Sequence, residues 1–181
     1  MIYVFLAEGF EEMEAIAPID LLRRAGCDVK TVAVSDKTVV TGAHAIPFVA
    51  DLLIDELEFD GLEAVILPGG IPGTPNLEAS SAVQAAIDEA VARGAVVGAI
   101  CAAPSILGHK GLLDGKRAIC YPGFENALTG AVVDPATYVV TDGRVVTARG
   151  AGVATDFGLE LVKILVSTET ADALREGIQC K

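Results

Sequence analysis

The sequence predicts an α/β fold with a mainly parallel central sheet and a small β-hairpin. Short runs of apolar and β-branched residues alternate with stretches in which apolar residues recur at helical spacing. This alternation is typical of parallel strands joined by helices. The chain has 181 residues, of which 52% are hydrophobic, enough to fill the core of one ordinary domain. We therefore expect residues 1–181 to form a single α/β domain.

The expected strands are short apolar runs bounded by turn residues. In chain order they span residues 2–6, 29–34, 64–67, 96–100 and 117–120. Residues 39–40 and 45–49 are expected to form a small β excursion beside this sheet. Asp142 and Gly143 are a strong two-residue hairpin signal between the β-branched segments 139–141 and 144–147.

Helices are expected between the strands. The apolar side chains of residues 13–25 share one helical face, and Gly26 ends that helix. Pro104 suits the first turn of a short helix, where its missing N–H costs little. The remaining helices follow the same periodicity. The expected set spans residues 13–25, 81–93 with a serine cap, 103–110, 154–166 and 170–176.

Charge and hydropathy exclude several partners. The net charge is −12, with 25 acidic and 13 basic residues. This opposes binding to nucleic acid or anionic membranes, since both need clustered Lys and Arg. No apolar run approaches the roughly 18 residues that a membrane span requires. The first residues carry no basic leader or cleavage site, so we expect a cytoplasmic protein.

The cysteines show no metal-binding pattern. Cys27, Cys101, Cys120 and Cys180 are scattered without paired spacing, and the chain has only two histidines. We therefore expect no metal site and free thiols. The pattern does not determine the reactivity of Cys27, Cys120 or Cys180.

Cys101 is the strongest candidate for chemistry. It lies where the strand of residues 96–100 turns into the next helix, at the edge of the sheet where parallel α/β folds bind ligands. The free N–H groups and the dipole of that helix favour negative charge, so we expect Cys101 to be more ionised than an ordinary thiol. The alternative is an inert cysteine buried in the core.

Glu14 is the candidate partner of Cys101. It belongs to an acidic first turn, where helix-end stabilisation alone explains Glu11 and Glu12. Glu14 differs because the residues that follow it face the interior. A partly desolvated carboxyl has a raised pKa and stays protonated, so it can donate a hydrogen bond to a thiolate.

Motifs along nearly the whole chain resemble the ThiJ/PfpI superfamily and, within it, the branch of the parkinsonism-associated deglycase. The matching pieces are Gly9-Phe10-Glu11-Glu12-Met13-Glu14, Leu22-Arg23-Arg24-Ala25-Gly26, Leu67-Pro68-Gly69-Gly70, Ala99-Ile100-Cys101-Ala102-Ala103-Pro104 and Ala148-Arg149-Gly150-Ala151-Gly152. Together and in this order they are highly specific.

The resemblance implies a flavodoxin-like three-layer sandwich and a homodimer. By position, Cys101 would be a nucleophile that is easily oxidised to a sulfinate, and Glu14 its protonated partner. The backbone N–H groups of Gly70 and Ala102 would form the oxyanion pocket, beside Gly69. No cofactor is implied.

One position departs from the family pattern. Deglycase and protease members carry a His just after the strand that ends here at Cys120, and this chain has Tyr121 there. A phenol is a poor general base at neutral pH, although it can donate a hydrogen bond. His44 is a further candidate for the pocket, because relatives often have a basic residue there; a solvent-exposed His44 is the alternative.

Two functions follow, with a third weaker one. The first is a cysteine-dependent stress-response enzyme of glyoxalase or deglycase type that hydrates small reactive aldehydes. The second is a redox sensor or chaperone whose Cys101 is oxidised to a sulfinate by a small oxidant. An intracellular cysteine peptidase is less favoured, because the paired His is missing.

Overall fold

A computed structural model describes residues 1–180 of the chain. Within these residues, seven strands form a central sheet in the order β10-β11-β7-β6-β1-β2-β5. All neighbours pair in parallel except β10 and β11, so the expected mainly parallel α/β fold is confirmed. These strands are β1 (Ile2–Leu6), β2 (Val29–Ala33), β5 (Leu52–Leu53), β6 (Ala64–Leu67), β7 (Val96–Ile100), β10 (Val139–Asp142) and β11 (Val145–Ala148).

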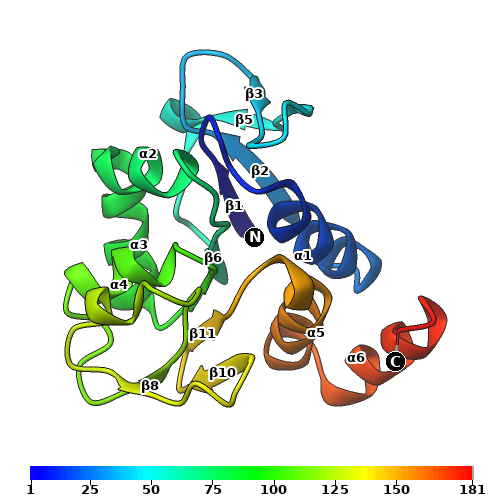
Figure 1. Ribbon diagram of the computed structural model, residues 1–181. Coiled ribbons are helices and arrows are strands. Elements are labelled where there is room, and N and C mark those ends of the chain that lie inside the picture. Colours follow the sequence, from blue (N-terminus) through cyan, green and yellow to red (C-terminus); the bar gives the residue numbers. More distant parts are fainter. Residues whose placement is uncertain (181) are drawn as a thin grey trace.

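Helices cover both faces of the sheet and make three layers (Figure 1). One face carries α1 (Glu12–Arg24) and α5 (Ala154–Leu165), with α6 (Thr168–Gly177) packed against α5. The other face carries α2 (Gly73–Ala79), α3 (Ser81–Arg93) and α4 (Pro104–His109). Short 3₁₀ turns occur at η1 (Ile54–Glu56), η2 (Glu125–Ala127) and η3 (Ala151–Val153).

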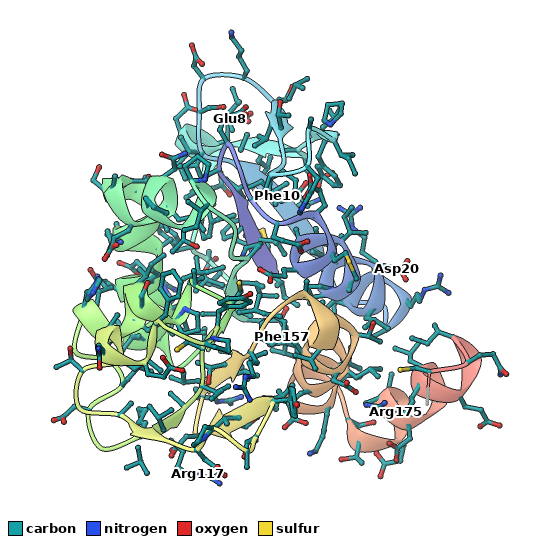
Figure 2. All side chains as sticks on the ribbon, viewed as in Figure 1. Glu8, Phe10, Asp20, Arg117, Phe157 and Arg175 are labelled. Atoms are coloured by element: carbon teal, nitrogen blue, oxygen red, sulfur yellow. The ribbon has the colours of Figure 1, made fainter. Side chains whose placement is uncertain are left out.

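The strand pattern explains the two cores. Successive strand side chains point to opposite faces of a sheet. In β1, Val4 packs on the α1/α5 side and Phe5 on the α3/α4 side, and both are fully buried. Gly98 of β7 leaves room for Phe157 of α5, whose Cζ atom would lie 3.1 Å from a Cβ at that position (Figure 2).

The smaller elements agree with local sequence signals. The predicted excursion is an antiparallel pair of β3 (Val39–Thr41) and β4 (Pro47–Val49). The predicted hairpin of β10 and β11 forms, but its two-residue turn is Gly143-Arg144, one residue later than the predicted Asp142-Gly143, because Asp142 pairs with Val145; Gly143 adopts a φ of 60° there. Helix α2 was not expected from sequence, because Gly73 and Pro75 disfavour helix interiors; Pro75 lies in its first turn, where proline is tolerated.

The prediction of a central strand over residues 117–120 is wrong. Only β8 (Arg117–Ala118) is extended, and it pairs with β9 (Val132–Val133) in a separate small sheet of the described chain. The segment lies against the sheet but forms no ladder with it, because side chains of the hairpin take its backbone donors. The Arg117 N–H donates to Oδ2 of Asp142 and the Ile119 N–H to Oγ1 of Thr147, each at 3.0 Å.

Candidate active site

Cys101 occupies a strained turn between β7 and α4. Its φ is 65°, a left-handed conformation that non-glycine residues rarely adopt. The turn is held on both sides, because the Cys101 N–H donates to the Ala148 carbonyl at 2.9 Å and the Tyr121 N–H donates to the Cys101 carbonyl at 2.8 Å. The side chain is half-buried at the carboxyl edge of the sheet. This backbone lifts the thiol out of line with the strand.

Glu14 lies beside this thiol in the first turn of α1. The carboxyl group is hydrogen-bonded to the Cys101 side chain, and its residue is only 1% exposed. Its Oε2 atom accepts the N–H of Gly69 at 2.9 Å, and the Ala151 N–H also donates to the carboxyl. The two predicted partners, Glu14 and Cys101, are therefore brought together.

The glycine loop after β6 completes the surroundings of the sulfur. The N–H groups of Gly70 and Ala102 both donate to Cys101. Gly70 needs its glycine, since its φ is 97° and a Cβ there would lie 2.4 Å from the Gly9 carbonyl oxygen. The two backbone donors expected from the family resemblance thus converge on the Cys101 sulfur.

Burial changes the proton affinity of both side chains. Burial raises the pKa of Glu14 to about 7, with a smaller upward contribution from the Glu11 charge, although the Cys101 hydrogen bond opposes the rise. Burial, together with the negative charge of Glu14, raises the pKa of Cys101 to about 12. This corrects the expectation of an acidic thiol from the helix N-terminus alone. Helix α4 has only six residues, and desolvation outweighs its dipole.

The two groups titrate as one pair. Because they share a hydrogen bond in a buried site, the two pKa values belong to the pair rather than to either atom. The first proton leaves near pH 7 and the second only near pH 12. Between these limits Glu14 and Cys101 hold one proton and one negative charge. In the microstate with the proton on Glu14, the sulfur is a hydrogen-bonded thiolate.

Tyr121 stands at the rim of the site rather than against the sulfur. Its side chain is half-exposed and its ring packs over Gly150, where a Cβ would lie 3.2 Å from Cδ2 of the ring. The motif of residues 148–152 does not by itself indicate a role for Gly150 or Ala151. Gly150 lies between Tyr121 and Glu14, because a Cβ added to Gly150 would also lie 3.9 Å from Oε1 of Glu14.

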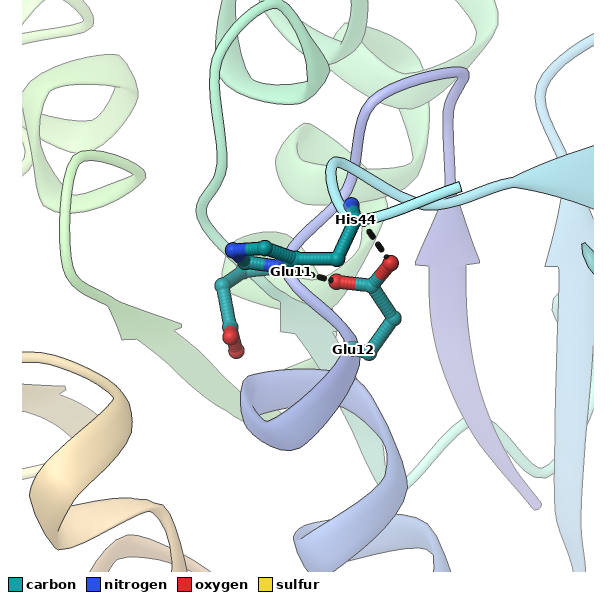
Figure 3. A group of neighbouring side chains, drawn as sticks. All are labelled: Glu11, Glu12 and His44. Carbon is teal, nitrogen blue, oxygen red and sulfur yellow. Dashed lines mark hydrogen bonds and ion pairs between the residues drawn. The ribbon is translucent and has the colours of Figure 1, made fainter. Parts of the chain in front are cut away.

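Within the described chain, both histidines pair with glutamates rather than with Cys101. His109 Nδ1 lies 2.5 Å from Oε1 of Glu78. His44 is bonded to the buried carboxylate of Glu12 through its backbone N–H and through Nδ1, each at 2.7 Å (Figure 3). These bonds hold the β3–β4 loop against the start of α1, and the ring of His44 is largely exposed.

The same corner contains a group with metal-ligating atoms. One ligand atom each from Glu11, Glu12 and His44 lie within 4.8 Å of one another. Sequence spacing did not reveal this group, because His44 is distant in the chain. Both Glu12 oxygens already accept bonds from His44, and Oε2 of Glu11 accepts the Glu14 N–H at 2.8 Å. We interpret the group as an ion pair that supports the α1 turn.

The rest of the chain adds little to the site. In residues 1–180 no helix combines the length and apolarity needed to cross a membrane. The four cysteines are free thiols, and Cys120 is buried next to Tyr121. Burial raises the pKa of Cys120 to about 11, and the charge of Glu125 adds to this. Cys120 is therefore less accessible to reagents than Cys101.

Comparisons with known proteins agree with this geometry. The family model of the DJ-1/PfpI family matches residues 1–164. The chain is 36% identical over 167 residues to DJ-1 homolog B of Arabidopsis thaliana, covering 92% of this chain but only 38% of that protein. The chain thus spans about two fifths of this relative's length.

Two further proteins match along nearly their whole length. A deglycase of Pyrococcus abyssi is 34% identical over 166 residues, covering 91% of this chain and 98% of that protein. The crystal structure of Drosophila melanogaster DJ-1β superposes with a TM-score of 0.93 at 32% identity, covering 99% of this chain and 97% of that one. The fold, the Cys101–Glu14 arrangement and these matches together show that the chain belongs to the DJ-1/PfpI family.

Proposed function

We propose that this chain is a cofactor-independent stress-response enzyme that hydrates small α-oxo aldehydes such as methylglyoxal to α-hydroxy acids. The observation that carries the proposal is the Glu14–Cys101 hydrogen bond, with the N–H groups of Gly70 and Ala102 directed at the same sulfur. A nucleophile, a proton carrier and two oxyanion donors thereby surround one point at the edge of the sheet.

The first step forms a carbon–sulfur bond. The Cys101 thiolate adds to the aldehyde carbon, and the carbonyl oxygen becomes an alkoxide. The Gly70 and Ala102 N–H groups stabilise that charge. The alkoxide then takes the proton of Glu14, which leaves a neutral hemithioacetal and a Glu14 carboxylate.

Glu14 carries the remaining protons, since Tyr121 replaces the family histidine. Its carboxylate removes the hydrogen from the former aldehyde carbon as a proton, and the electron pair moves through an enediol to the keto carbon. Glu14 returns the proton there, which gives the thioester of an α-hydroxy acid. The aldehyde carbon is oxidised and the keto carbon reduced, so no outside oxidant takes part. Water then cleaves the thioester and restores the thiol and the acid.

The test compares two cysteine variants. Cys101→Ser should abolish formation of lactate from methylglyoxal, whereas Cys27→Ser, which removes a half-buried thiol, should retain it. Lactate is measured directly, because methylglyoxal also reacts with exposed amines. Undiminished lactate formation by Cys101→Ser would refute the proposed function.

A redox sensor is the second candidate. Cys101 is half-buried but accessible, and a protonated Glu14 can donate a hydrogen bond to a sulfinate oxygen. Tyr121 is a poor general base in the place of the family histidine, so we expect it to weaken catalysis more than the oxidation of Cys101. Two equivalents of peroxide would add two oxygen atoms to Cys101 and release two waters. Mass spectrometry should find this product on Cys101 before Cys27, Cys120 or Cys180 are oxidised; equal oxidation of all four would contradict it.

We further propose that two copies of the chain associate through α1. A cavity of about 520 Å³ lies along the outer side of this helix. Met13, Ile16 and Ile46 line it, and they are 58%, 43% and 53% exposed. Asp20, seen on the outer side of α1 in Figure 2, pairs with Arg24 at 2.6 Å. An apolar surface that carries both charge signs suits a self-complementary two-fold interface, so the occupant we propose is a second copy.

A further inference from the structure

A cavity of about 380 Å³ opens next to the candidate active site. It is lined by the rings of Tyr121 and Tyr138, by Arg149 and by the backbone of residues 150–153, among others. Within the described chain, Arg149 is the only charged residue in this lining. The cavity is much larger than methylglyoxal requires, so a substrate that fills it has an additional group beyond its reactive carbonyls.

The cavity adjoins the catalytic pair through Gly150 and Ala151. Both residues line it, Ala151 donates its N–H to the Glu14 carboxyl, and Gly150 lies between Glu14 and the ring of Tyr121. The Tyr121 N–H, at the opposite wall of the cavity, donates to the Cys101 carbonyl at 2.8 Å. The cavity thus lies beside the catalytic pair, and a substrate bound at Cys101 can extend into it.

Arg149 is held firmly at the cavity. Its Nη1 donates to the Pro135 carbonyl at 2.6 Å, and its Cζ lies 5.3 Å from the centre of the Tyr138 ring. A guanidinium carries five N–H donors, and within residues 1–180 the other four have no hydrogen-bond partner. The stacking and the single bond fix the group without consuming its capacity to bind a ligand.

Charge indicates what those donors bind. The protein carries a net charge of −12, and the negative charge of Glu11 acts on Glu14 of the catalytic pair. The fixed guanidinium of Arg149 is a positive charge in otherwise negative surroundings. Such a group binds a carboxylate through two parallel hydrogen bonds. We propose that Arg149 binds the distal carboxylate of the substrate, so that the preferred substrates are α-oxo aldehydes ending in an acid group. This inference rests on the proposed function.

The first test compares one acid with its neutral ester. The probes are γ,δ-dioxovalerate, an α-oxo aldehyde with a terminal carboxylate, and its methyl ester. The protein should turn over the acid with a kcat/KM roughly 10- to 100-fold above that of the ester, as expected for a charge-assisted hydrogen bond. Arg149→Gln should remove this preference through the KM of the acid and leave the ester unaffected, and Arg149→Lys should retain part of it. Arg144→Gln, which removes the same charge at an exposed hairpin position, should keep the full preference.

The second test does not depend on turnover. Pentanoate should slow the alkylation of Cys101 by iodoacetamide at concentrations at which pentanamide has no effect, and Arg149→Gln should abolish this protection at constant ionic strength. Equal protection by acid and amide, or protection that survives Arg149→Gln, overturns the inference. Consumption of both aldehydes without preference for the acid also overturns it and leaves the proposed function intact. If neither aldehyde is consumed, the proposed function fails, and the protection assay still decides whether Arg149 binds a carboxylate.

Discussion

Oε2 of Glu14 accepts a hydrogen bond from the backbone N–H of Gly69 at 2.9 Å, which ties the first turn of α1 to the loop after β6. A second bond runs the other way, from the Glu11 N–H to the Gly69 carbonyl, also at 2.9 Å. The two loops thereby present the Glu14 carboxyl to Cys101 in one orientation. The properties of the site depend on this junction.

Glu14→Gln should lower the pKa of Cys101 and speed its alkylation at alkaline pH, because the negative charge of Glu14 raises that pKa. In the wild type the pair loses its first proton near pH 7, so alkylation by iodoacetamide should rise through that pH. In the variant the thiol ionises alone, and burial holds its pKa above the ordinary value of 9.0. The alkylation rate at pH 9, where Glu14 of the wild type is charged, should therefore be roughly tenfold or more above that of the wild type.

Glu11→Gln is the matched control for this measurement. The Glu11 charge contributes to the raised pKa of Glu14, so its removal should move the midpoint of alkylation to lower pH. A pH profile for Glu14→Gln identical to that of the wild type would contradict the coupled pair.

Glu14 should also make the stability depend on pH. Its folded pKa of about 7 lies above its ordinary value of 4.5, so the unfolded chain releases this proton first. The contribution of Glu14 is fully present below pH 4.5, decreases as the pH rises and is lost above pH 7, a total of about 3 kcal/mol. Urea unfolding between pH 4.5 and 7.5 should show a smaller decrease for Glu14→Gln than for the wild type. Parallel curves would exclude a raised pKa.

Gly69→Ala should disrupt the junction directly. The added Cβ would lie 2.6 Å from Cβ of Cys101, 2.6 Å from Oε2 of Glu14 and 3.0 Å from the Ile100 carbonyl oxygen. Overpacking of this kind costs about 1–3 kcal/mol and should separate the catalytic pair. Gly177→Ala, where a Cβ meets nothing within 4 Å, is the control. Wild-type stability and thiol reactivity in Gly69→Ala would show that the junction tolerates a side chain.

Ile16→Asp should convert the proposed dimer into a monomer. A charge in the middle of the apolar surface on α1 would be buried without a partner in the dimer. Sedimentation should give twice the chain mass of 18.6 kDa for the wild type and the chain mass for the variant. Val91→Asp changes a similarly exposed helical position, 46% against 43%, and should remain dimeric. A monomeric wild type would refute this interface.

Most of the fold was predictable because its signals are local. The apolar run of β7, the small residues after it and Pro104 at the start of α4 predict a strand, a turn and a helix from neighbours in the chain. The prediction of a strand over residues 117–120 is wrong for the same reason, since it rested on local composition alone. The composition of this segment suits a strand, but its backbone N–H groups donate to side chains of the distant hairpin, Asp142 and Thr147, so it forms no ladder with the central sheet.

The sequence by itself determined the α/β class and the position of Cys101 at a strand-to-helix turn, since these follow from periodicity and from residues adjacent in the chain. It also indicated Glu14 as a candidate partner, from its place at the border of a buried helix face and from the family resemblance. Only the tertiary structure decided the proton affinity of the pair and the place of Arg149. The pKa of Cys101 is raised because burial removes water from the thiol and because the negative charge of Glu14, from a distant helix, opposes its ionisation. Arg149 becomes a candidate anion site because Pro135 and Tyr138 hold its guanidinium at the cavity, and no local sequence pattern encodes these contacts.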